Sequence, residues 1–78
     1  PQGLRKTVKR RTFKAIMALV NTVAEVAEAM DHHPDIFIHE WNRVTFTIIT
    51  HSERAVTDRD LALARKVEAV ISPSASRS

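Results

Sequence analysis

The chain has 78 residues and 44% hydrophobic content, which allows one domain with a core and argues against wholesale disorder. It contains no cysteine, which excludes disulfides, thiolate zinc sites and a thiol nucleophile. The net charge of +3 is uneven, because residues 1–14 carry six Lys/Arg and no acid, whereas the rest is mildly acidic. We expect a single domain over residues 1–78, with a basic arm at 1–12, a body at 13–71 and a disordered tail at 72–78.

The basic arm has two possible explanations. It could attract phosphates, or it could be an edge strand whose charges prevent unwanted pairing. No aromatic residue that could stack on bases is interleaved with the charges. We therefore favour the edge strand and do not expect nucleic-acid binding. We also expect no membrane insertion, because the apolar run AIMALV (15–20) is far too short to span a bilayer.

In chain order, the first expected element is a strand over residues 4–12, after which Thr12 can cap a helix. Apolar residues then recur at spacings of three and four, which predicts a helix of about five turns. Its expected stripe comprises Phe13, Ile16, Met17, Val20, Val23, Ala24, Ala27 and Met30. Pro34 ends the helix, because a proline pushes the residue before it toward extended angles.

Residues 36–41 and 44–51 predict a β-hairpin with a two-residue turn at Asn42-Arg43. One face of its second strand is apolar, and the other is rich in threonine. Thr57 to Asp60 then resembles a capping box that opens a second helix, which runs to about Ile71. The expected stripe of this helix follows Leu61, Ala64, Val67 or Glu68, and Ile71, and Leu63, Val67 and Val70 widen it. The order β-α-β-β-α predicts an α+β fold, with an antiparallel sheet and helices packed on one face.

Several titratable side chains surround the hairpin: Glu28, Asp31, His32, His33, His39, His51, Glu53 and Asp60. If the first helix persists, Glu28 can reach His32 at i,i+4 and fix its tautomer. Three explanations remain open. The histidines can be ordinary turn and strand-end residues, with Asp60 only a cap. They can bind a metal, although no HxH or HxxxH spacing is present. They can line one pocket for acid/base chemistry.

The spacing of these residues resembles a known signature. It runs Glu28, three residues, His32-His33-Pro34, six residues, Trp41, nine residues, His51, eight residues, Asp60. This is similar to the pterin-4a-carbinolamine dehydratases, known in animals also as dimerisation cofactors of a homeodomain transcription factor. The flanking runs HHPDI, NRVT and TDRDLALA are similar too, and the resemblance covers about residues 8–71. The chain departs from the family in lacking most of an N-terminal segment and in having no glycine after His51.

The resemblance implies dehydration of 4a-hydroxytetrahydropterin to quinonoid dihydropterin, without a metal or other cofactor, in tetrahydrobiopterin recycling. It implies that His32, His33 and His51 form the catalytic pocket, with His32 and His51 as the proton-transfer pair. It implies a substrate-binding role for Glu28, Asp31, Pro34, Thr50, Ser52 and Glu53, and a supporting role for Trp41 and Asp60.

The resemblance also implies a homodimer or homotetramer in the cytoplasm, with the nucleus as a second compartment and a transcription factor as a second partner. The alternative function is an oligomeric interaction module, or transcriptional coactivator, that needs no catalysis.

Overall fold

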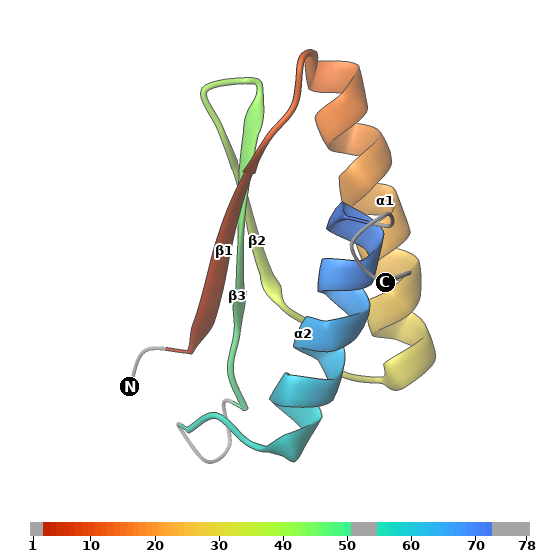
Figure 1. Cartoon of the computed structure of the whole chain (residues 1–78), viewed down its shortest axis with the longest axis vertical. Coiled ribbons are helices and arrows are strands. Elements are labelled where there is room, and N and C mark those ends of the chain that lie inside the picture. Colours follow the sequence, from red (N-terminus) through yellow and green to blue (C-terminus); the bar gives the residue numbers. More distant parts are fainter. Residues whose placement is uncertain (1–2, 51–54, 73–78) are drawn as a thin grey trace.

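The computed structural model describes residues 3–50 and 55–72. Its elements follow the order β1 (Leu4–Lys9), α1 (Phe13–Met30), β2 (Asp35–His39), β3 (Arg43–Ile48) and α2 (Asp58–Ile71). The strands form one antiparallel sheet in the order β1-β3-β2. Both helices lie on the same side of this sheet (Figure 1). The predicted α+β fold and its β-α-β-β-α order are therefore confirmed.

Helix α1 begins as the sequence predicts, because the side chain of Thr12 accepts a hydrogen bond from the backbone N–H of Ala15 at 3.0 Å. Its buried face differs from the predicted stripe. Leu19 is buried, whereas Phe13 is 51% exposed and Ala24 is exposed. Helix α1 is apolar around much of its circumference, so spacing alone does not identify the side that meets the sheet.

The sheet buries one face and leaves the other open. Val44, Phe46 and Ile48 of β3 are at most 4% exposed and pack against the helices, as the alternation predicts. The strand ends differ from the prediction, because β1 ends at Lys9 and β2 ends at His39.

The hairpin turn also differs, because it contains residues 40–42 rather than Asn42-Arg43. Arg43 already pairs with His39 as the first residue of β3. Glu40 and Trp41 adopt positive φ values of 52° and 53°. The predicted turn at Asn42-Arg43 did not include these two residues.

Helix α2 begins at the predicted capping box, in which the backbone N–H of Thr57 donates to Oδ2 of Asp60 at 2.7 Å. Leu63 and Val67 carry its buried face together with Asp60. Leu61, which the predicted stripe included, is 43% exposed. Within the described residues, neither helix combines the length and apolarity needed to cross a membrane.

Candidate active site

The exit of α1 directs His32 away from the helix axis. Asp31 adopts left-handed angles, with φ 52° and ψ 41°, and ends the helix. The backbone N–H of Asp31 donates to the carbonyl of Glu28 at 3.2 Å, and that of His32 donates to the carbonyl of Ala27 at 3.1 Å. Both bonds are made to carbonyls in the last turn of the helix, whose end is thereby closed. The turn thus fixes the backbone from which His32 projects.

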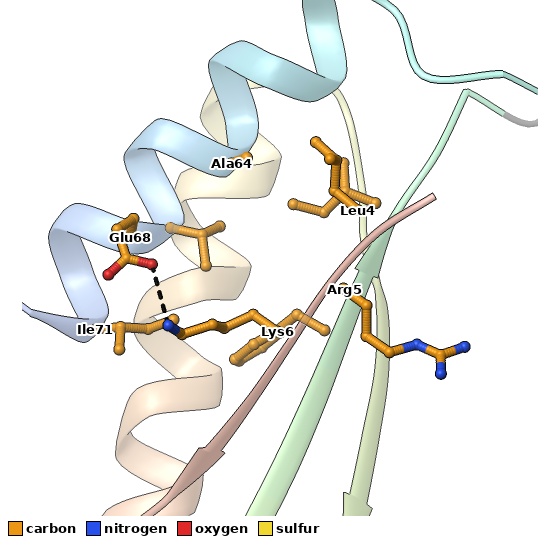
Figure 2. A pocket seen from close by; sticks show the side chains of 9 residues that line it. Leu4, Arg5, Lys6, Ala64, Glu68 and Ile71 are labelled. Carbon is orange, nitrogen blue, oxygen red and sulfur yellow. Dashed lines mark ion pairs between the residues drawn. The ribbon is translucent and has the colours of Figure 1, made fainter. Parts of the chain in front are cut away.

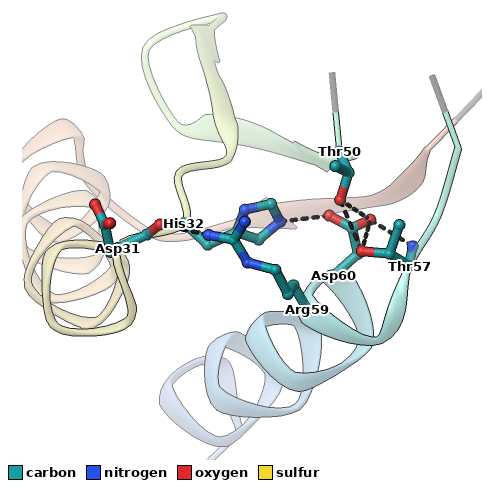
Figure 3. Close-up of polar contacts among 6 residues, drawn as sticks. All are labelled: Asp31, His32, Thr50, Thr57, Arg59 and Asp60. Carbon is teal, nitrogen blue, oxygen red and sulfur yellow. Dashed lines mark hydrogen bonds and ion pairs between the residues drawn. The ribbon is translucent and has the colours of Figure 1, made fainter. Parts of the chain in front are cut away.

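His32 is buried against the first turn of α2. Its Nε2 lies 2.5 Å from Oδ1 of Asp60, and the two residues are 9% and 0% exposed, respectively. Figure 3 shows the imidazole and the carboxylate facing each other between the two helix ends. The sequence predicted Asp60 as a cap, and the structure adds a second role, because the same carboxylate holds His32.

The other oxygen of Asp60 is held by two threonines. Oδ2 accepts from the Oγ1 of Thr50 at 2.9 Å, and from the backbone N–H and Oγ1 of Thr57 at 2.7 and 3.3 Å (Figure 3). Every buried side-chain nitrogen or oxygen in the described part of the chain has a hydrogen-bond partner. The buried charge of Asp60 is therefore matched by donors from three segments of the chain.

The hydrogen bonds keep Asp60 ionised despite its burial. Burial by itself raises the pKa of the Asp60 carboxyl, but hydrogen bonds from His32, Thr57 and Thr50 and the charge of His32 outweigh it. The pKa falls from 3.8 to about 2. An ionised carboxylate only accepts hydrogen bonds, so Nε2 of His32 must carry the hydrogen between them. Nδ1 is then the ring nitrogen left for proton exchange.

His33 takes the partner that the sequence assigned to His32. Its Nε2 lies 2.6 Å from Oε2 of Glu28, and the two side chains are 55% and 77% exposed. The predicted contact between Glu28 and His32 is therefore wrong. The i,i+4 spacing brings side chains together only while the helix continues, and here the left-handed Asp31 ends it one residue before His32. The adjacent imidazoles thus have separate carboxylate partners, one buried and one exposed.

Arg59 is a residue that the sequence reasoning missed. Its Nη2 donates to the backbone carbonyl of Asp31 at 2.8 Å (Figure 3). Consecutive residues of α2, Arg59 and Asp60, therefore hold consecutive residues of the α1 exit, Asp31 and His32. The run TDRD placed Arg59 in the first turn of a helix, but no spacing in the sequence connects it with a carbonyl 28 positions earlier.

The structure brings some of the other predicted residues to this cluster and leaves others out. Thr50 is buried and bonded to Asp60, so it supports the carboxylate rather than lining an open surface. Asp31 is exposed and Pro34 half-buried in the turn beside His32. The predictions for His51, Ser52 and Glu53 lie outside the described residues.

Two predicted candidates lie apart from His32. Trp41 is 60% exposed in the hairpin turn. The next residue, Asn42, accepts a bond from Arg10 just before α1, so Trp41 and His32 lie at opposite ends of that helix (Figure 1). His39 bonds to Thr45, at 3.0 Å, on the face of the sheet that the helices do not cover.

A separate cavity of about 180 Å³ lies between β1 and α2 (Figure 2). Its lining is mainly apolar, with an ion pair of 3.7 Å between Lys6 and Glu68 at its edge. No histidine lines it. Across residues 3–50 and 55–72, no three His, Asp or Glu side chains gather closely enough to hold a metal ion. The cavity is therefore separate from the two imidazole–carboxylate pairs at the α1 exit.

The family comparison matches nearly the whole chain. The sequence model of the family described as "Pterin 4 alpha carbinolamine dehydratase" matches residues 1–70. A relative from Mycolicibacterium vanbaalenii, provisionally named a pterin-4-alpha-carbinolamine dehydratase, is 47% identical, and the match covers 88% of this chain and 73% of that protein. A relative from Nocardia farcinica with the same provisional name is 51% identical over 81% of this chain and 65% of its own length.

The fold also matches a solved structure. It is a crystal structure from Brucella melitensis, whose protein is described as a transcriptional coactivator/pterin dehydratase. The two structures align with a TM-score of 0.78 and 37% identity, and the alignment covers 86% of this chain and 70% of the other. The similarity thus extends to both sequence and architecture.

Proposed function

Because the chain belongs to the pterin 4 alpha carbinolamine dehydratase family, we propose that it dehydrates 4a-hydroxytetrahydropterin by histidine acid/base catalysis. In this reaction the C4a–O bond breaks, and the hydroxyl leaves with an added proton as water. N5 loses its proton, and its electron pair forms the C4a=N5 double bond of quinonoid dihydropterin. The net change is loss of one water, so the reaction needs one proton donor, one proton acceptor and no oxidant.

The observation that carries this proposal is the bond between buried His32 and buried Asp60. A carboxylate on one ring nitrogen stabilises the protonated imidazole and leaves the other nitrogen to exchange a proton with substrate. Hydroxide is a poor leaving group, so donation from this nitrogen to the C4a oxygen would lower the barrier. His32 therefore acts as the proton donor in the proposed mechanism.

We assign the remaining roles from the sequence signature and the described contacts. His51 is the second proton-transfer residue, and His33 with Glu28 binds the polar edge of the pterin. Thr50, the residue before His51, bonds to the same carboxylate as His32, which supports placing the two imidazoles in one site. The physiological substrate in this proposal is the 4a-hydroxypterin left by aromatic amino acid hydroxylases, and the compartment is the cytoplasm.

The direct test is the decay of chemically generated 4a-hydroxytetrahydropterin, followed by ultraviolet absorbance with and without the purified chain. We expect faster decay that is unchanged by a metal chelator. A double substitution of His32→Ala and His51→Ala should abolish the acceleration. The proposal fails if the wild-type chain leaves the decay rate unchanged, or if the double variant, shown to be folded, retains the full rate.

A second candidate function is that of an oligomeric coactivator, as the description of the Brucella melitensis protein suggests. It is favoured by exposed apolar side chains on α1, where Phe13 is 51% exposed and Ala24 is exposed. We propose that this face contributes to a homodimer or homotetramer, which could also engage a transcription factor in the nucleus. Light scattering tests this: Phe13→Asp should reduce the measured mass, and a monomeric wild-type chain would count against it.

A further inference from the structure

No described element covers the face of the sheet opposite the helices (Figure 1). Strand register and alternation place three residues of each strand on it. Figure 2 shows Arg5 pointing away from α2, whereas its neighbour Lys6 points toward Glu68. Three rows therefore cross the sheet, and we call them the open face: Arg5-Thr47-Asp35, Thr7-Thr45-Phe37 and Lys9-Arg43-His39.

The centre of the open face presents an aromatic ring with a fixed support. Phe37 is 64% exposed, and its ring lies parallel to that of His39, with centroids 4.9 Å apart and an interplanar angle of 17°. His39 is itself held by Thr45, whose hydroxyl also bonds to Thr7 at 2.8 Å. One side of the Phe37 ring is thus covered by a positioned imidazole. The opposite side of the Phe37 ring is available for stacking with another planar ring.

Positive charge lies on the same face as this ring, along the opposite edge strand. Arg5 and Lys9 lie on β1 at either side of Thr7, and both are exposed. Lys9 also borders a shallow hollow with Arg10, Arg11 and Asn42, where the guanidinium of Arg10 donates to the carbonyl of Ile71 on the helix side. The opposing charges nearby are Asp35 at one corner and Glu40, whose carboxylate pairs with Arg43 at 2.6 Å. The open face is therefore net positive around an exposed ring.

We propose that the open face binds single-stranded nucleic acid, with a base stacked on Phe37 and phosphates held by Arg5 and Lys9. Non-specific single-strand binding combines a basic surface with an aromatic platform, since every base has a stacking face. The basic arm lacks an aromatic residue in the sequence, but the register supplies one, because Thr7 and Phe37 share a row across Thr45. If a second copy of the chain stacked on the same face, the positive side chains of the two copies would repel one another. This repulsion disfavours self-association through the open face.

The test is fluorescence anisotropy of a labelled oligothymidylate of about 12 nucleotides with the full chain. We expect binding at about 50 mM salt that weakens roughly tenfold at about 200 mM, as a few phosphate contacts require. Phe37→Ala should weaken binding about tenfold or more through lost stacking, and Lys9→Gln should weaken it and reduce the salt dependence. Phe37→Leu, which keeps an apolar side chain but removes the ring, should behave like Phe37→Ala.

Matched controls lie on the helix side of the molecule. Leu61→Ala removes an exposed apolar side chain and Lys66→Gln removes an exposed positive charge, both on α2, and both variants should bind like the wild type. The proposal is overturned if the wild-type chain binds more weakly than about 100 µM at low salt, the weak limit of non-specific binding. It is also overturned if both Phe37 variants keep wild-type affinity while their melting curves show a folded chain.

Discussion

Nε2 of His32 lies 2.5 Å from Oδ1 of Asp60, although 28 positions separate the two residues in the chain. The bond joins the exit of α1 to the first turn of α2, so neither helix can form it alone. A fully buried carboxylate is costly unless donors surround it, and here those donors come from three segments. The proposed proton donor is therefore positioned by the tertiary fold.

Replacing Asp60 with asparagine removes the charge and keeps the size of the side chain. We expect a loss of about 3 kcal/mol in the free energy of unfolding, because a buried partner of His32 is lost. We expect kcat to fall roughly tenfold or more, because the imidazole loses the group that fixes its tautomer. Asp58→Asn is the control, since Asp58 is exposed in the same turn. Urea unfolding and dehydration kinetics should separate the two variants, and equal behaviour would contradict the assigned role.

The stability of the protein should depend on pH through Asp60. Its pKa is lowered to about 2 in the folded state from 3.8, so its contribution is fully present above pH 3.8. That contribution, on the order of 2 kcal/mol, is lost as the pH falls from 3.8 toward 2. Urea unfolding across this range should show the stability advantage of the wild type over Asp60→Asn shrinking with acid. A constant difference would show that this carboxylate does not titrate as described.

Glu28 should behave differently from Asp60, because its partner His33 is exposed. The Glu28→Gln substitution should change the free energy of unfolding by less than about 1 kcal/mol, since exposed ion pairs are weak. In the proposed mechanism it should raise KM more than it lowers kcat. His33→Asn combined with Glu28→Gln should have a less than additive effect on KM. Additive effects in this double-mutant cycle would mean that the pair does not act as a unit on substrate.

The hydroxyl of Thr50 should stabilise the buried carboxylate. Thr50→Val removes the bond to Oδ2 of Asp60, and we expect a loss of about 1 kcal/mol in the free energy of unfolding. Thr50→Ser keeps the hydroxyl and should recover most of this stability. Thr47→Val on the open face of β3 is the matched control, with an expected change within about 0.5 kcal/mol. Thermal and urea denaturation check the series, and equal losses at both threonines would rule out the special role of Thr50.

Local patterns in the sequence predicted the framework of this fold. Thr12 caps α1, alternation orients Val44, Phe46 and Ile48, and Thr57 with Asp60 opens α2, because each depends on residues close together in the chain. The buried faces of the helices were less predictable. Leu19 is buried although the predicted stripe omitted it, and Phe13 and Leu61 are exposed although the stripes included them, since tertiary packing decides which side of an apolar helix meets the sheet.

The contacts of the candidate site could not be read from spacing. The i,i+4 rule pairs Glu28 with His32, but the left-handed Asp31 ends the helix and sends His32 to Asp60. His32 and Asp60 are 28 positions apart, so no helical or strand periodicity predicts their contact. The same holds for Arg59 and the carbonyl of Asp31. The signature named Glu28, His32, His33 and Asp60 for one site, and the structure assigns which carboxylate each imidazole contacts.

The most direct test of the account is kcat for dehydration of 4a-hydroxytetrahydropterin by His32→Gln, compared with the wild type. Glutamine can still donate a hydrogen bond to Asp60, so the fold should persist, while the titratable nitrogen is lost. The account predicts a fall in kcat of roughly 100-fold or more, in line with the loss of a general acid. A folded variant with kcat close to that of the wild type would contradict it.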